Sequence, residues 1–181
     1  MTTNDGSTHH IQVGALAHRI VAHVLREGWP DQRHERNALV VRAGRAEMDA
    51  QPVTYRPREA LLEAVTAAGV YLWRFQPAAE WTPVMIEQPL FDVRPDVVFE
   101  HADHGVLIDE LKIGVGRSGE DRVRAQIDRY VEAGSARWAD RFIGVRLCSV
   151  HEPGRSRIHL PGRRRSLLTV EHALAEEIAP R

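Results

Sequence analysis

The stretch Arg94-Pro95-Asp96-Val97-Val98-Phe99, followed after a short turn by Val106-Leu107-Ile108-Asp109-Glu110-Leu111-Lys112, decides how the middle of this 181-residue chain folds. Both segments are apolar runs bounded by polar residues, and the short loop between them suits an antiparallel hairpin. Residues i and i+2 of a strand point to one face, so Glu110 and Lys112 share a side, and the hairpin partner can bring Asp96 beside them. The sequence therefore predicts two carboxylates and an ammonium in one pocket.

The three side chains have a chemistry in common. Carboxylate oxygens with open water positions are what a Mg2+ or Mn2+ ion binds. A lysine beside such a metal can orient or deprotonate an attacking water. The pocket is therefore expected to hydrolyse phosphodiester bonds.

The pattern resembles the PD-(D/E)xK nuclease superfamily, with Pro95-Asp96 as the first half of the motif and Glu110-Leu111-Lys112 as the second. A second similarity follows in the next expected helix, where Gln126 and Tyr130 form a Gln-x-x-x-Tyr motif like that of the RecB-like branch. The two residues share a face with Val123 and Ile127, so the Gln126 amide is expected to find a partner near the strands.

The order of expected elements also looks like this superfamily. A helix is expected from Pro57, then strands at 84–90, 93–100 and 106–113, then a helix opened by Ser118-Gly119-Glu120-Asp121, then a buried strand at 142–148. The resemblance covers about residues 57–148. It implies an α/β fold with a restriction-endonuclease-like αβββαβ core, in which helices flank a mixed central sheet. We expect a single nuclease-like domain over 1–181, with helical extensions at 1–56 and 149–181.

The resemblance also implies roles for individual residues. The metal is expected on the side chains of Asp96 and Glu110 and the backbone carbonyl of Leu111. The upstream helix often supplies a further acid in this family, for which Glu63 is the candidate and Glu59 its rival.

The other roles concern the water and the phosphate. Lys112 is expected to position the attacking water, and Gln126 and Tyr130 to brace the phosphate or Lys112. Asp92 and Asp109 lie close to the motif in sequence, but strand alternation sends Asp109 to the face opposite Glu110.

Outside the motif, four further expectations concern local structure. Apolar residues at helical spacing predict a helix over 11–28, closed by Gly28 and Pro30. Residues 37–54 are interpreted as a hairpin. We expect Gly69 and Gly134 to end the helices that precede them, and residues 167–178 to form a final amphipathic helix.

Rival motifs leave other functions open. Gly114-Val115-Gly116-Arg117-Ser118-Gly119 fits the G-x-G-x-x-G of a dinucleotide site, which would make the chain a nicotinamide or flavin enzyme. Too little chain follows for a doubly wound sheet, so a loop that lets a nucleic-acid backbone approach is preferred. His101 and His104 could bind a metal, but a polar turn is the simpler interpretation. Core packing is the default for the aromatic residues Trp29, Tyr71, Trp73, Phe75 and Trp81.

The composition sets the broad class. With 43% hydrophobic and 27% charged residues the chain is expected to be globular, and a polar N-terminus without a membrane-length apolar run predicts a cytoplasmic location and no membrane partner. Cys148 is the only cysteine, which excludes an internal disulfide and a Cys-rich metal site; a buried, inert thiol is expected. The net charge of −1 does not by itself indicate nucleic acid, but local arginines can contact phosphates. They are Arg122, Arg124, Arg129, Arg155, Arg157, Arg163, Arg164 and Arg165.

These observations predict a Mg2+-dependent or Mn2+-dependent nuclease whose partner is nucleic acid, with DNA expected. The alternative is a catalytically inactive subunit of the same fold that binds nucleic acid or acts as a scaffold. Cutting both strands with one site per chain would require a homodimer. Strandedness of the substrate, endo- or exonucleolytic cutting and the biological pathway are open.

Overall fold

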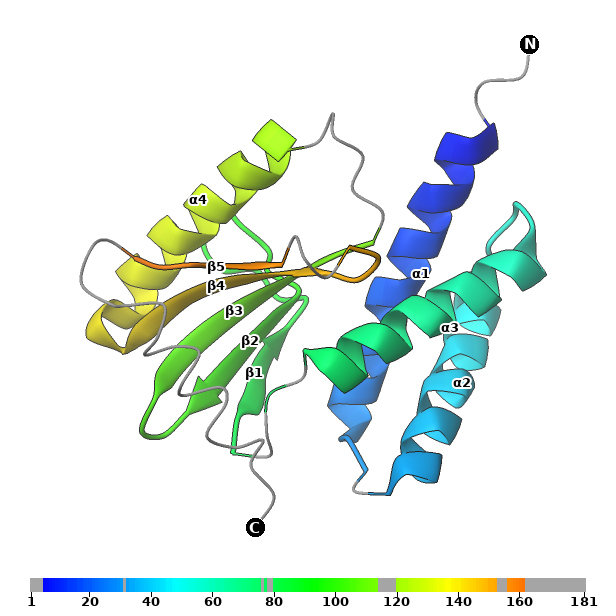
Figure 1. Ribbon diagram of the computed structural model, residues 1–181, viewed down its shortest axis with the longest axis horizontal. Coiled ribbons are helices and arrows are strands. Elements are labelled where there is room, and N and C mark those ends of the chain that lie inside the picture. Colours follow the sequence, from blue (N-terminus) through cyan, green and yellow to red (C-terminus); the bar gives the residue numbers. More distant parts are fainter. Residues whose placement is uncertain are drawn as a thin grey trace. The chain divides into compact units, whose positions relative to one another are not determined.

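The computed structural model describes residues 5–30, 32–75, 77, 80–113, 120–152 and 156–161 (Figure 1). The helices are α1 (Asp5–Glu27), α2 (Arg33–Ala50), α3 (Pro57–Arg74) and α4 (Glu120–Trp138), with a short 3-10 helix, η2 (Ala139–Arg141). The strands are β1 (Thr82–Ile86), β2 (Val97–His101), β3 (Gly105–Lys112), β4 (Phe142–Ser149) and β5 (Arg157–His159). The chain forms two compact units, one of Met1–Phe75 with Lys112–Gly114 and one of Gln76–Leu111 with Val115–Arg181.

The helical unit consists of α1, α2 and α3, which pack against one another. Leu16, Ile20 and Val24 recur at helical spacing along α1 and are fully buried, as expected for an amphipathic helix. The helix ends where its sequence predicts, because Gly28 adopts a φ of 93° and its N–H still bonds to the Val24 carbonyl. Burial of this apolar stripe is what holds the unit together.

Residues 37–54 do not form the expected hairpin. They lie largely in α2. The buried positions of this helix form one stripe along it, which is the pattern of an amphipathic helix: Leu39, Val40, Ala43 and Gly44. A side chain at Gly44 would put its Cβ 2.6 Å from Val65 of α3, so glycine permits close approach of the two helices. The β-branched run at 40–41 is overridden by this packing.

Two other glycines lie inside helices that we expected them to end. Helix α3 continues past Gly69 because Tyr71 and Leu72 beyond it are buried. Helix α4 continues past Gly134, where the ring of Phe142 occupies the space that a side chain would need. Glycine in a helix costs about 1 kcal/mol relative to alanine, which packing of the following turn can offset.

The second unit contains a sheet in the order β1-β2-β3-β4-β5. The expected hairpin is confirmed: β2 and β3 are antiparallel, with Val97 opposite Asp109 and His101 opposite Gly105. Strand β1 pairs antiparallel with β2, and β5 pairs antiparallel with β4. Strands β3 and β4 are neighbours joined through α4, as parallel strands require, so the sheet is mixed. The described residues therefore have an α/β fold, and the expected order of helix, three strands, helix and strand is observed.

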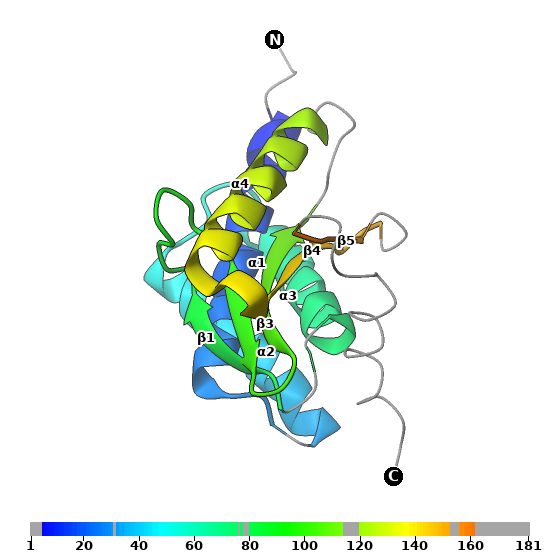
Figure 2. The same ribbon diagram turned by 90° about the vertical axis from the view of Figure 1, so that its left-hand side faces the viewer.

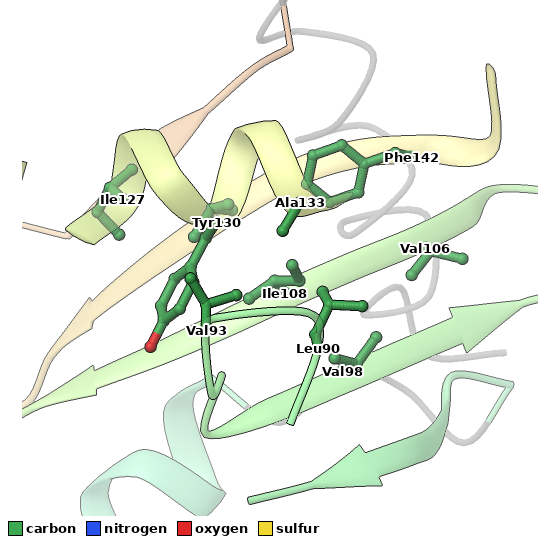
Figure 3. Packing of buried hydrophobic residues seen from close by; sticks show 10 residues of the cluster. Leu90, Val93, Val98, Val106, Ile108, Ile127, Tyr130, Ala133 and Phe142 are labelled. Atoms are coloured by element: carbon green, nitrogen blue, oxygen red, sulfur yellow. The ribbon is translucent and has the colours of Figure 1, made fainter. Parts of the chain in front are cut away.

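Helix α4 lies along one face of the sheet, and the core of this unit lies between them (Figures 2 and 3). The helix contributes Ile127, Tyr130 and Ala133, which face Val98 and Ile108 of β2 and β3. This apolar layer fixes the helix on the strands.

A glycine in β4 decides which of its side chains face α4. Phe142 and Val145 both belong to the layer under α4 although they are three residues apart, so the two-residue alternation is interrupted between them. Gly144 lies at this point with a φ of 148°, and a Cβ there would be 2.5 Å from the His159 carbonyl of β5. The interruption turns Arg146 away from α4.

Several expected features lie outside the described residues. These are the glycine-rich segment at 114–119, the arginines 155 and 163–165, and the final helix at 167–178.

Candidate active site

The two halves of the motif meet through one short hydrogen bond. The backbone N–H of Leu111 donates to Oδ2 of Asp96 over 2.7 Å. Asp96 lies one residue before β2, and the pairing of Val97 with Asp109 brings it to the end of β3. The hairpin register therefore delivers the Asp96 carboxylate to the backbone between Glu110 and Lys112, as the sequence predicts.

Glu110 is buried under α4, with only 2% of its surface exposed. Its Oε1 accepts a hydrogen bond of 2.9 Å from Nε2 of Gln126. Removing a carboxylate from water is costly unless hydrogen bonds compensate, so this amide stabilises the buried position. Gln126 has the specific partner near the strands that its place on the inner face of α4 predicts.

Tyr130 connects this pair to the other half of the motif. Its hydroxyl accepts from Nε2 of Gln126 over 2.8 Å and donates to the backbone carbonyl of Arg94 over 2.9 Å. In Figure 3 the hydroxyl oxygen points away from the apolar side chains around the ring. One hydroxyl thus joins the Glu110 carboxylate, through Gln126, to the chain segment that leads into Asp96.

The ionisation of Tyr130 reports on its surroundings. Burial raises the pKa of the Tyr130 hydroxyl strongly, and the negative charges of Glu110 and Asp96 raise it further. The hydroxyl therefore stays protonated at physiological pH and can donate to the Arg94 carbonyl. Both motif carboxylates act electrostatically on this one group.

Glu87 is an acidic residue at the site that our sequence interpretation missed. The carboxylate oxygens of Glu87 and Asp96 lie within 4.8 Å of each other, and the N–H of Glu87 bonds to the Asp96 carbonyl over 2.9 Å. The register of β1 with β2 explains this position, because Ile86 pairs with Val97 and the next residues in that register are Glu87 and Asp96. Glu87 has a φ of 53°, which costs a non-glycine residue about 1–2 kcal/mol.

Arg94 stabilises this turn. Its Nε donates to the carbonyl of Glu87 over 2.7 Å, and its Nη2 lies 3.3 Å from the Glu87 carboxylate. Leu90 and Val93 close the intervening loop with a reciprocal pair of backbone hydrogen bonds. Side-chain and backbone contacts thus hold the Glu87 turn beside the Pro95-Asp96 segment.

Lys112 is the last residue of β3, two residues after Glu110, and is half-buried. Because side chains alternate along a strand, those of Glu110 and Lys112 point to the same face of the sheet. Lys112 is also the only lysine in the sequence. Elsewhere the chain uses arginine as its long basic side chain. A lysine supplies a compact ammonium that can lose its proton, whereas an arginine guanidinium cannot.

The acids expected from the upstream helix both lie in the helical unit. Glu63 of α3 accepts a hydrogen bond of 3.1 Å from His9 of α1. Glu59, its rival, pairs with Arg56 over 3.0 Å at the start of the same helix. These are exposed contacts within that unit, and the role of Glu63 as a metal ligand stays a prediction.

The other acids near the motif have structural partners. Asp109 is fully buried on the face away from α4 and binds Arg146 of β4 through two hydrogen bonds, of 2.9 Å and 2.6 Å. The expectation that alternation separates Asp109 from Glu110 agrees with this placement. Asp92 is exposed and pairs with Arg129 of α4 over 2.7 Å.

His101 and the Cys148 thiol also have structural surroundings. Nδ1 of His101 accepts the backbone N–H groups of Asp103 and His104, so this nitrogen organises the turn between β2 and β3. Cys148 is fully buried, and burial raises the pKa of its thiol well above the usual value, with the charge of Asp109 adding to the effect. The thiol is therefore protonated and unreactive, as expected.

Comparison with protein-family models, with curated proteins and with solved structures finds no match to this chain. Among the described helices, none combines the length and apolar character needed to cross a membrane.

The chemistry of the donors at the site suits a hard divalent cation. The carboxylate oxygens of Asp96 and Glu87 lie within 4.8 Å of each other, whereas among the described residues no group of three possible ligands this close together includes Glu110. Mg2+ and Mn2+ prefer all-oxygen sets, whereas zinc sites use histidine or cysteine. The Asp96 and Glu87 carboxylates are of the type that binds the cation that the sequence predicts, and the ligand roles of Glu110 and Leu111 stay predictions.

Replacing Tyr130 with phenylalanine should destabilise the sheet unit by about 1–3 kcal/mol, because the change removes both hydrogen bonds of a buried hydroxyl and leaves their partners unsatisfied. The measurement is urea unfolding followed by circular dichroism. We expect a lower midpoint with an unchanged slope. A midpoint equal to that of the parent would show that the bonds to Gln126 and Arg94 contribute nothing to folding.

Proposed function

We propose that this chain is a metal-dependent nuclease that hydrolyses phosphodiester bonds, with DNA as its expected substrate. The observation that carries the proposal is the 2.7 Å hydrogen bond from the Leu111 N–H to the Asp96 carboxylate. It brings together two short motifs that are 15 residues apart in the chain.

The proposed roles follow from the contacts of each side chain. Asp96 and Glu110 hold the cation together with the carbonyl of Leu111, and Glu87 adds negative charge next to Asp96. When bound, Mg2+ or Mn2+ neutralises charge on the scissile phosphate and lowers the pKa of a bound water.

We assign Gln126 and Tyr130 a positioning role, whereas the resemblance implies that they brace the phosphate or Lys112. Gln126 donates to Glu110 and to the Tyr130 hydroxyl, which donates to the Arg94 carbonyl, so the pair positions the two halves of the motif. Lys112 holds the attacking water and offsets charge that develops on the phosphate.

A cleavage assay tests the proposal directly. Purified protein is incubated with linear, circular and single-stranded DNA in Mg2+, in Mn2+ and in a chelator, and the products are separated on denaturing gels. Cleavage of at least one substrate in Mg2+ or Mn2+ is expected, with none in the chelator, because the carboxylates need the cation to act on a phosphodiester. An Asp96→Asn variant provides the control for a contaminating nuclease. Equal cutting by this variant, or cutting in the chelator, would contradict the proposal.

One observation favours the alternative of an inactive binding subunit. Glu110 is almost completely buried and one of its oxygens is committed to Gln126, which is compatible with a purely structural acid. Calorimetric titration of Mn2+ separates the two proposals. Uptake of Mn2+ that is lost in Asp96→Asn favours the enzyme, whereas no uptake by the parent favours the binding subunit.

A further inference from the structure

A cluster of two tryptophans and two arginines lies at one end of the helical unit. The Trp29 and Trp73 rings meet edge to face with their centres 5.6 Å apart. The guanidinium carbon of Arg36 lies 5.2 Å from the centre of each ring, and that of Arg33 lies 5.6 Å from the centre of Trp73. We call these four residues the Arg–Trp cluster.

The fold holds this cluster in place from three elements. Arg33, Arg36 and Asn37 are three and four residues apart on α2, so they share one face of the helix. Nε1 of Trp73, in the last turn of α3, donates to Oδ1 of Asn37 over 3.2 Å and fixes the orientation of its ring. Trp29 comes from the segment between α1 and α2. The arrangement is therefore built by tertiary packing.

Core filling does not account for the cluster. Trp73 keeps 42% of its surface exposed, whereas Tyr71, in the same turn of α3, is fully buried. The expectation that Trp73 packs in the core is therefore wrong for this residue. Arg33 is exposed as well.

The charge of the cluster is not neutralised within the described residues, where no carboxylate forms an ion pair with Arg33 or Arg36. Nε of Arg36 donates to the Pro30 carbonyl, which orients the guanidinium and leaves its outer N–H groups for another acceptor. A guanidinium held against a ring is pre-organised for phosphate, because its donors lie at the edge of the group.

We propose that the Arg–Trp cluster binds a single strand of nucleic acid. Arg33 and Arg36 contact backbone phosphates, and the exposed part of Trp73 takes an unpaired base. That the bound polymer is a nucleic acid rests on the proposed function. The cluster itself supplies the cationic and aromatic groups that bind it. Stacking requires an unpaired base, which a single strand supplies and an intact duplex does not.

Fluorescence anisotropy of a labelled single-stranded oligonucleotide tests the proposal, in a chelator so that no cleavage occurs. The double variant Arg33→Ala/Arg36→Ala is expected to bind about tenfold more weakly than the parent. Its dependence of log Kd on log salt should be shallower by about 1.4, because each lost phosphate contact on a single strand removes about 0.7.

A matched double variant controls for the loss of two charges. Arg45 and Arg58 are exposed residues of the same unit, and Arg45 is nine residues from Arg36, so it lies on the opposite side of α2. Arg45→Ala/Arg58→Ala should keep the affinity of the parent within about twofold and a nearly unchanged salt slope. Equal weakening in both double variants would overturn the proposal.

The stacking part has its own test. Trp73→Ala should weaken binding about tenfold, and Trp73→Phe should recover part of the affinity because it retains a ring. Circular dichroism verifies that each variant is folded. If Trp73→Phe binds no better than Trp73→Ala while both are folded, a stacked base is excluded.

The outcomes separate this proposal from that of the nuclease. If the parent cleaves DNA while the cluster variants bind the single strand as tightly as the parent does, this proposal is overturned and the nuclease proposal stands. Cluster-dependent binding without cleavage in any metal would support the cluster and overturn the nuclease. Competition by poly-glutamate as effective as that by the oligonucleotide would identify an acidic protein segment as the partner and overturn the nucleic-acid assignment.

Discussion

Replacement of Lys112 with alanine is expected to lower the rate of DNA cleavage by about 10²- to 10³-fold, the loss typical of removing one group that stabilises transition-state charge. The reason is that no other lysine exists in the chain to take its place, and none of the neighbouring motif residues carries a positive charge. The measurement is single-turnover cleavage with Mg2+ present. Binding of the oligonucleotide in a chelator should remain close to that of the parent.

Lys112→Arg distinguishes the chemistry of the ammonium from its charge. A guanidinium keeps the positive charge but stays protonated and is larger, so recovery should be partial at most. Cleavage by Lys112→Ala at the rate of the parent would remove Lys112 from the mechanism. Cleavage by Lys112→Arg at the rate of the parent would show that charge alone is needed.

The second large effect is expected at Asp109. Asp109→Ala should destabilise the protein by about 3–5 kcal/mol, because it leaves the largely buried side chain of Arg146 without its bidentate partner. Only 11% of the Arg146 side chain is exposed, so water replaces the carboxylate poorly. Chemical unfolding of the parent and the variant gives the difference in free energy.

Two controls accompany this measurement. Asp109→Ala/Arg146→Met removes both charges and should recover much of the loss, since a buried ion pair is often matched by apolar packing. Asp92→Ala breaks an exposed pair with Arg129 and should leave the unfolding midpoint near that of the parent. If Asp109→Ala also leaves the midpoint unchanged, the buried pair does not stabilise the sheet.

Much of the sheet unit was predictable because its signals are local. Apolar runs bounded by polar residues indicated β2 and β3, and the short loop at 101–105 indicated that they pair antiparallel. Once the register is known, the approach of Asp96 to Leu111 follows from strand geometry alone. The sequence also predicted that Gln126 would have a hydrogen-bond partner near the strands, because a side-chain amide on the inner face of a helix needs its hydrogen bonds made.

The errors arose where distant residues decide local structure. Helix α2 contains β-branched residues that favour a strand, and its packing against α1 and α3 overrides them. Gly134 stays helical because Phe142, from the next strand, fills the space beside it. Glu87 was missed because its proximity to Asp96 depends on the register of β1 with β2, which an irregularity near Pro83 shifts.

The sequence by itself determined the order of the central elements and the identity of the motif residues, because periodicity, turns and residue chemistry are properties of short segments. Only the tertiary structure decided what those residues touch: Tyr130 joins the two halves of the motif, Asp109 goes to Arg146, and Trp73 is left exposed beside two arginines. Hydrogen bonds and packing depend on distances between residues far apart in the chain, and such distances are set only when the elements assemble.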